Sequence, residues 1–98
     1  MSTRMHRSTD NVFANLGFPA EEAESLRIRA DLMIALGKLL AARRLTQVAA
    51  AALLGVSQPR ISDLMHGKIE RFSIDTLVAM LGRAGVTVRF TTKRRRVA

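Results

Sequence analysis

The chain has 98 residues, no cysteine, two histidines and a net charge of +8. This length suits one small domain with a core of several helices, and the missing cysteines exclude disulfides, cysteine-ligated zinc and thiol catalysis. We therefore expect a binding protein that is not an enzyme and that uses no metal and no cofactor. No apolar run approaches a membrane span and the N-terminus lacks the apolar core of a secretory signal, which predicts a cytoplasmic protein.

The positive charge is unevenly distributed along the chain. Residues 1–42 hold five basic and five acidic side chains, so the whole excess lies after residue 42. A basic half predicts a polyanion as partner, with nucleic acid the commonest candidate and an anionic membrane surface the alternative. A charged surface that only keeps the protein in solution is a third interpretation, and charge alone does not choose among them.

The first half of the chain predicts an arm followed by a long helix. Residues 1–12 are polar and have no apolar period, which indicates a mobile arm. Pro19 and the acidic residues that follow it mark the start of a helix that continues to about Ala42, with a wide apolar stripe. A break at residues 29–31 is an open alternative, because one uninterrupted helix would be long for so small a domain.

Three more helices follow, each opened by a hydroxyl side chain. Thr46 is a good N-cap for a helix that ends at Gly55, where glycine can adopt the left-handed conformation that stops a helix. Ser57 caps the next helix and Ser73 the last one. The sequence thus predicts four or five helices.

The C-terminal end predicts a strand and a basic tail. In the segment VTVRFTT, apolar and polar residues alternate, which is the pattern of a half-buried strand over residues 86–91. A lone strand needs a partner to pair with. Residues 93–98 form a charged tail that either contacts a polyanion or is solvated.

The two helices on either side of Gly55 fit the helix-turn-helix arrangement over residues 46–66. The tight crossing needs a small residue in the first helix, which Ala51 supplies, and a glycine in the turn. The positions that the unit must bury are apolar, namely Ala50, Leu54, Val56, Ile61 and Leu64. The first turn of the second helix then projects outward, so this helix can enter a DNA major groove.

The same residues resemble a known family. The stretch LTQVAAAALLGVSQPRISDLMHGK resembles the phage-repressor (Xre) type of helix-turn-helix, and DLMIALGKLL and FSIDTLVAMLGRAG look like its flanking helices. The resemblance implies an all-α, five-helix lambda-repressor-like domain over residues 13–92, here with the short C-terminal β-strand. The wider stretch that begins at NVFANLGF is similar to a HigA-like subgroup of antitoxins.

Two positions depart from the family pattern. Val48 and the alanines after it stand where such proteins often place charged residues, which leaves the exposed side of this helix unusually apolar. A packed partner or a dimer mate would explain that surface. Arg44 stands where a glycine or asparagine often ends the preceding helix.

The resemblance also implies the DNA contacts, by matching position. Gln58 is the best candidate for a base contact because its amide can pair with adenine, while Arg60 offers a fork to guanine or a clamp on a phosphate. Gln47 bonds a phosphate or braces the reading helix. The full set of expected DNA-binding residues is Thr46, Gln47, Ser57, Gln58, Pro59, Arg60, Ser62, Asp63, Lys68 and Arg71, the last two on phosphates.

These features predict a sequence-specific transcriptional regulator that binds double-stranded operator DNA as a homodimer, in the cytoplasm on the nucleoid and without a membrane partner. The antitoxin resemblance and a surplus of apolar surface further predict an autorepressing antitoxin with a small RNase as partner. This surface comprises Leu26, Ile28, Leu32 and Met33 together with Val12, Phe13, Leu16 and Phe18. The open alternative for this surface is that the segment folds back on the domain or builds the dimer. The alternatives are a stand-alone Xre-type repressor and a protein-interaction module with an incidental basic surface.

Overall fold

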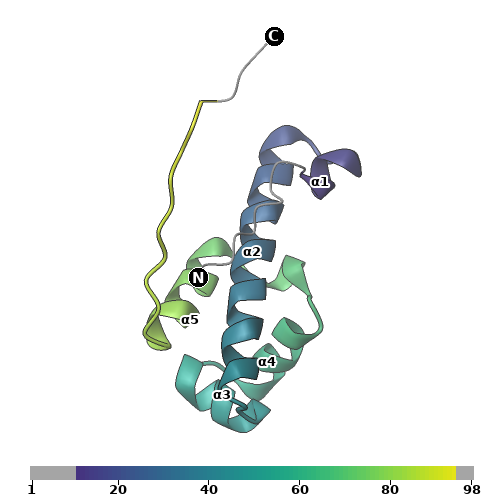
Figure 1. The fold of residues 1–98 in the computed structure, drawn as a ribbon. Helices are drawn as coiled ribbons and strands as arrows, with labels where there is room; N and C mark the ends of the chain where they lie inside the picture. The colour runs from purple at the N-terminus through teal and green to yellow at the C-terminus, as the bar shows by residue number, and fades with distance from the viewer. Residues whose placement is uncertain (1–10, 95–98) are drawn as a thin grey trace.

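The structure is a computed structural model that describes residues 11–94 of the chain. Its elements are, in chain order, α1 (Val12–Asn15), α2 (Ala20–Ala42), α3 (Gln47–Leu54), α4 (Gln58–Met65), the short 3-10 helix η2 (Ile69–Arg71) and α5 (Ile74–Arg83). Figure 1 shows α2 as a central rod, with α5 beside it, α3 and α4 at one end and α1 folded against the other end. The five α-helices of the described residues confirm the all-α prediction.

Helix α2 is continuous, so the break considered at residues 29–31 does not occur. Arg27 spans this stretch along one face of the helix, where its guanidinium pairs with Glu24 at 2.6 Å and with Asp31 at 3.4 Å. Ion pairs at these spacings stabilise an uninterrupted helix. The length of α2 is accommodated because α1, α4, η2 and α5 all pack along it.

Hydroxyl caps begin the three helices after α2, as the sequence predicts. The side chains of Thr46, Ser57 and Ser73 each accept a hydrogen bond from the backbone N–H three residues further on. Gly55 ends α3 with a φ of 71°, in the left-handed region. Pro59 lies in the first turn of α4, where its missing N–H leaves no hydrogen bond unmade.

The end of α2 uses a left-handed residue that is not glycine. Arg44 has a φ of 52°, and no other non-glycine residue within 11–94 has a positive φ. The conformation lets the Leu45 N–H donate to the Leu40 carbonyl at 3.4 Å, which closes the last turn. A residue with a Cβ atom pays about 1–2 kcal/mol for it, so the departure from the family pattern at Arg44 is a site of backbone strain.

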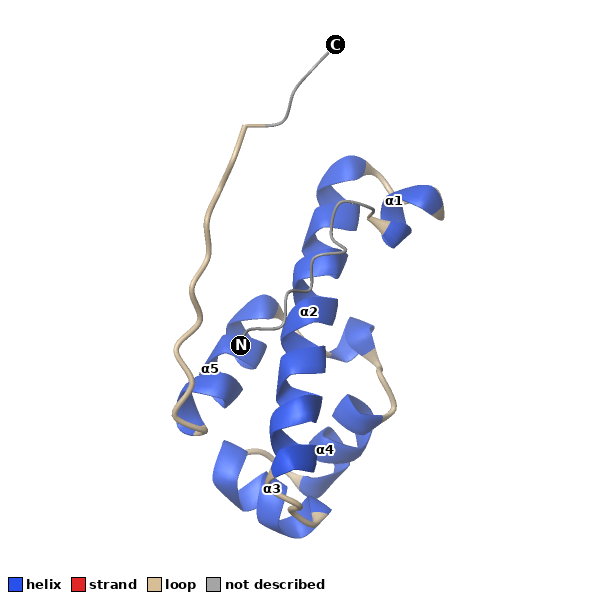
Figure 2. Ribbon diagram, in the orientation of Figure 1, coloured by secondary structure: helices blue, strands red, loops and turns tan. Residues whose placement is uncertain are grey.

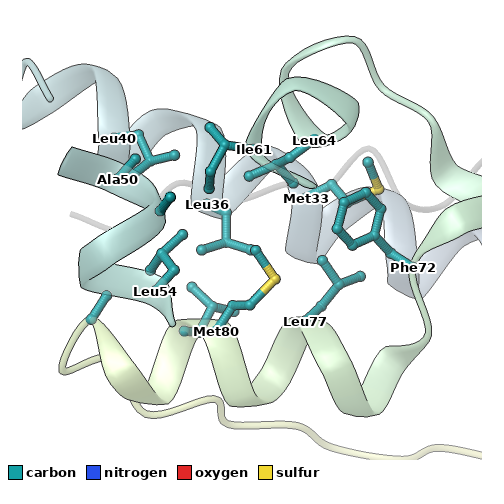
Figure 3. Close-up of a cluster of buried hydrophobic side chains, with 13 residues drawn as sticks. Met33, Leu36, Leu40, Ala50, Leu54, Ile61, Leu64, Phe72, Leu77 and Met80 are labelled. Atoms are coloured by element: carbon teal, nitrogen blue, oxygen red, sulfur yellow. The ribbon is translucent and has the colours of Figure 1, made fainter. Parts of the chain in front are cut away.

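The core lies where α2, α3, α4 and α5 meet, and Figure 3 shows Leu36 of α2 in its middle. Leu36, Ile61 and Leu77 have no exposed surface. The other members of the buried cluster are Met33, Leu40, Ala50, Ala51, Leu54, Leu64, Phe72, Met80, Leu81 and Ala84. Because this one cluster draws side chains from every long helix, it fixes α3 and α4 against the end of α2.

The predicted strand over residues 86–91 is wrong for the single chain: these residues are extended but no strand is formed within 11–94 (Figure 2). The physical reason is that a strand exists only beside another strand, and the rest of the described chain is helical. Val86 and Val88 nevertheless pack against the core, whereas Phe90 is 82% exposed.

The N-terminal end of the described chain is helical rather than an arm. The Asn11 side chain accepts hydrogen bonds from the first N–H groups of α1 and donates to the Ala23 carbonyl of α2 at 3.1 Å. Asn11 and Val12 therefore belong to the folded domain. The other residues of the predicted arm, 1–10, and residues 95–98 of the predicted tail lie outside the described part, while Lys93 and Arg94 are exposed.

Candidate nucleic-acid interface

The helix-turn-helix unit expected over residues 46–66 is formed by α3, the turn at Gly55 and α4. Ala51 is only 9% exposed at the crossing of the two helices, which leaves no room for a larger side chain. Ile61 and Leu64 are buried and attach α4 to the core, while Ser57, Gln58 and Pro59 are exposed. The first turn of α4 is therefore held firmly from behind and open in front.

The structure brings Gln47 and Gln58 together across the turn. The Gln58 Nε2 atom donates to the Gln47 Oε1 atom at 3.3 Å. Gln58 keeps its own carbonyl oxygen and a second N–H for another partner, which is the donor and acceptor pair that adenine requires. Of the two roles expected for Gln47, bracing the reading helix fits this contact directly.

Arg60 lies differently from its neighbour Gln58. Its Nη1 atom donates to the Arg71 carbonyl at 2.8 Å, and its guanidinium carbon lies 4.8 Å from the centroid of the buried Phe72 ring. This cation–π contact and hydrogen bond hold the side chain against the segment that follows α4. A contact from Arg60 to a base would use its remaining donors or require the guanidinium to turn outward.

Of the other residues expected to bind DNA, some have side-chain partners within the protein and others are simply exposed. Arg71 and Asp63 form an ion pair at 3.2 Å, so each offsets the charge of the other. Ser62 lies beside His66, whose Nδ1 atom is 2.8 Å from the Ser62 carbonyl oxygen. Lys68, just after α4, is exposed, and Thr46 is exposed at the start of α3.

A protein-family model described as a helix-turn-helix domain matches residues 12–92. The chain belongs to this helix-turn-helix family. It is also similar to a solved structure that carries the name XRE family transcriptional regulator, with 34% sequence identity, a TM-score of 0.71 and coverage of 79% of this chain and 90% of that chain. Comparison with curated proteins found no match. Neither similarity assigns the chain to the HigA-like subgroup, which stays a prediction.

Two arginines that support the helix-turn-helix domain were missed by the sequence analysis. The Arg29 Nη1 atom, on α2, donates to the Ile69 carbonyl at 3.3 Å and to the Phe72 carbonyl at 3.5 Å, which holds the segment that carries Arg71. Arg83 donates from Nε to the Leu53 carbonyl at 3.5 Å, at the C-terminal end of α3 where a cation is favoured. The sequence pattern around Arg29 or Arg83 predicts neither contact, because each contact joins residues at least 30 positions apart.

Within residues 11–94, no three histidine or carboxylate side chains are close enough together to hold a metal ion. In the same part of the chain, no helix has the length and apolar character needed to cross a membrane.

Proposed function

We propose that this protein is a transcriptional regulator that binds double-stranded operator DNA with α4 in the major groove. The observation that carries the proposal is the first turn of α4, which is exposed around Gln58 and fixed from behind by Ile61 and Leu64. A major groove about 12 Å wide admits one such helix. The similarity to a protein named XRE family transcriptional regulator supports the same role. We expect the protein to act on the nucleoid in the cytoplasm, and not as an enzyme.

In this mode the side chains have separate tasks. Gln58 reads a base edge, and Pro59 beside it offers an apolar contact for a thymine methyl group. Thr46 and Gln47 lie at the start of α3, where free N–H groups and the helix dipole favour a phosphate. Lys68, in the segment just after α4, adds a phosphate contact, and such contacts orient the domain without reading sequence.

Selection of bound duplexes from a random library tests this function. Because we propose a homodimer, the enriched sequence should be a near-palindrome whose half-sites lie about 34 Å, or one helical turn, apart. If the protein is instead a protein-interaction module, no sequence should be enriched, and binding to random duplexes should disappear at moderate salt. Enrichment of a single asymmetric half-site would support sequence-specific DNA binding but contradict the homodimer.

We further propose that the regulator is the antitoxin of a pair and contacts a small RNase through the α1 end of the molecule. Large apolar side chains stay exposed there even though α1 folds against α2: Val12 is 56% exposed, Leu16 71% and Phe18 40%. Exposed apolar patches of this kind mark interfaces. In Figure 1, α1 lies at the opposite end of α2 from α3, so a partner bound at α1 leaves α4 free for DNA.

Co-expression with the product of the adjacent gene tests the antitoxin role. We expect a stable complex and relief of that product's toxicity, and Leu16→Asp should abolish both while operator binding is kept. Asn15→Asp, a charge change at the neighbouring exposed position, is the matched control and should preserve the complex. A non-toxic neighbour that forms no complex would make the protein a stand-alone repressor.

A further inference from the structure

The segment after α5 is an extended chain with open backbone edges. Within the described residues, the last backbone hydrogen bond joins the Val86 N–H to the Leu81 carbonyl at 2.9 Å. From there the chain runs extended to Arg94, drawn in yellow-green to yellow in Figure 1. The family match continues through this segment to residue 92, although the last helix ends at Arg83. The extended segment therefore belongs to the family domain, although it is not helical.

The side chains of this segment alternate in their surroundings. Val86 and Val88 are half-buried against the core, while Thr87 and Arg89 between them are exposed. Phe90 continues the apolar series but is 82% exposed, the highest value among the exposed large apolar side chains. The segment thus has the two faces of a strand, with one apolar residue that nothing in the described chain covers.

We propose that two copies of the chain pair these segments as an antiparallel two-stranded ribbon centred on Val88. This inference rests on the homodimer of the proposed function and names its interface. The occupant of the open edge is a second copy because the segment is complementary to itself. In an antiparallel pair centred on Val88, Val86 lies opposite Phe90 of the partner subunit on one face. On the other face, Thr87 lies opposite Arg89 of the partner subunit.

Several neighbouring registers are less favourable. Centring on Arg89 puts two like charges directly opposite each other, which destabilises a pair of strands. Centring on Phe90 puts Val86 opposite Arg94 and breaks the apolar face. A centre between two residues places every apolar side chain opposite a polar one, because side chains alternate with a period of two.

An isolated pair of strands is only marginally stable in water, but this ribbon is further stabilised because it packs on the domain. Val86 and Val88 already lie on the core, so each strand is attached to its own domain before it pairs. Pairing then brings Phe90 of the partner subunit beside Val86, where the core surface can cover it. Pairing therefore satisfies one backbone edge of each segment and covers the exposed Phe90 at the same time.

Single cysteines test the register, since the chain has no cysteine of its own. Directly opposite residues have Cβ atoms about 4.5–5.5 Å apart, close to the reach of a disulfide. Full-length Val88→Cys should therefore form a covalent dimer rapidly under mild oxidation. Val86→Cys and Phe90→Cys should each crosslink at least tenfold more slowly alone, because each lies about 13 Å from its own copy at ~3.3 Å per residue. In an equal mixture of the two variants, the heterodimers should crosslink as fast as Val88→Cys, while the homodimers stay largely uncrosslinked.

If a substitution at Val88 impairs folding, the exposed residues Thr87 and Arg89 allow the same test. Thr87→Cys mixed with Arg89→Cys should crosslink more than either variant alone. Equal crosslinking of every variant, or faster crosslinking of Phe90→Cys alone, would overturn the register. A dimer in sedimentation that crosslinks at none of these positions would overturn the ribbon and leave the homodimer intact. A monomer that still selects an operator would remove both ribbon and homodimer and leave the DNA-binding proposal standing.

Discussion

At the scale of residues, the first turn of α4 separates a side chain that can read DNA from one that holds the fold. Sequence reasoning predicts a base contact for Gln58 and either a base contact or a phosphate contact for Arg60. In the structure, Gln58 reaches only Gln47, whereas Arg60 is tied to the Arg71 carbonyl and the Phe72 ring. Position in a helix shows which side chains point outward, but not which tertiary partner an arginine finds.

For that reason, Gln58→Ala tests base recognition by α4 more directly than a substitution of Arg60 does. We expect it to weaken binding to the selected operator by about 1–3 kcal/mol and to leave binding to random duplexes unchanged, because a base contact is lost while the phosphate contacts remain. Fluorescence anisotropy titrations of the operator and of a scrambled duplex give both values. Equal losses on the two duplexes would show that Gln58 does not read a base.

Lys68→Ala should behave in the opposite way. The residue is exposed beside the reading helix and contacts a phosphate in the proposed complex. We expect binding to all sequences to fall alike, and the slope of log K against log salt to shrink by about one unit. A loss confined to the operator, with an unchanged salt slope, would contradict the phosphate role.

Arg44→Gly should stabilise the protein by about 0.5–1 kcal/mol in urea unfolding. The substitution removes the strain of a Cβ atom at a φ of 52°, and part of the gain is offset by the greater freedom of glycine in the unfolded chain. Arg43→Gly is the matched control: its φ of −88° is ordinary, and its side chain donates to the Ala84 carbonyl at 3.1 Å. The control should destabilise, and the same sign for both variants would count against the strain.

At the scale of elements, the sequence is informative where structure depends on neighbours along the chain. The hydroxyl caps at Thr46, Ser57 and Ser73 mark three helix starts because the cap and the N–H that it bonds are three residues apart. The strand over residues 86–91 could not be settled in this way, because its formation depends on a second strand. Helix α1 was missed although Asn11 and Gly17 bracket it, since four residues are too few to show an apolar period.

The crossing of α3 and α4 can be tested with two adjacent alanines. Ala51→Leu should destabilise the domain by about 1–3 kcal/mol, because this side chain is 9% exposed and an added isopropyl group must push the helices apart. Ala52→Leu is the matched control at an exposed position and should change the free energy of unfolding by less than about 0.5 kcal/mol. Thermal unfolding of the two variants measures the difference, and equal effects would mean that the crossing is not tight at Ala51.

At the scale of the whole molecule, α2 separates two surfaces of different character. One end presents the exposed apolar residues of α1, and the other carries α3 and α4 (Figure 1). The charge follows the same division along the sequence, because residues 1–42 are balanced and the whole excess of +8 lies after residue 42, in the part of the chain that carries α3 and α4. The arrangement suits a protein that contacts DNA at one end and a protein partner at the other.

The most direct measurement is the ratio of dissociation constants for a scrambled duplex and the selected operator, taken at physiological salt. Sequence-specific regulators bind their sites at least about 10³-fold more tightly than other DNA. We expect a ratio of that order for the wild-type chain, because the fixed and exposed first turn of α4 reads base edges. A ratio near one, with both affinities collapsing together as salt rises, would show that the protein binds DNA through its charge alone and would contradict the proposed function.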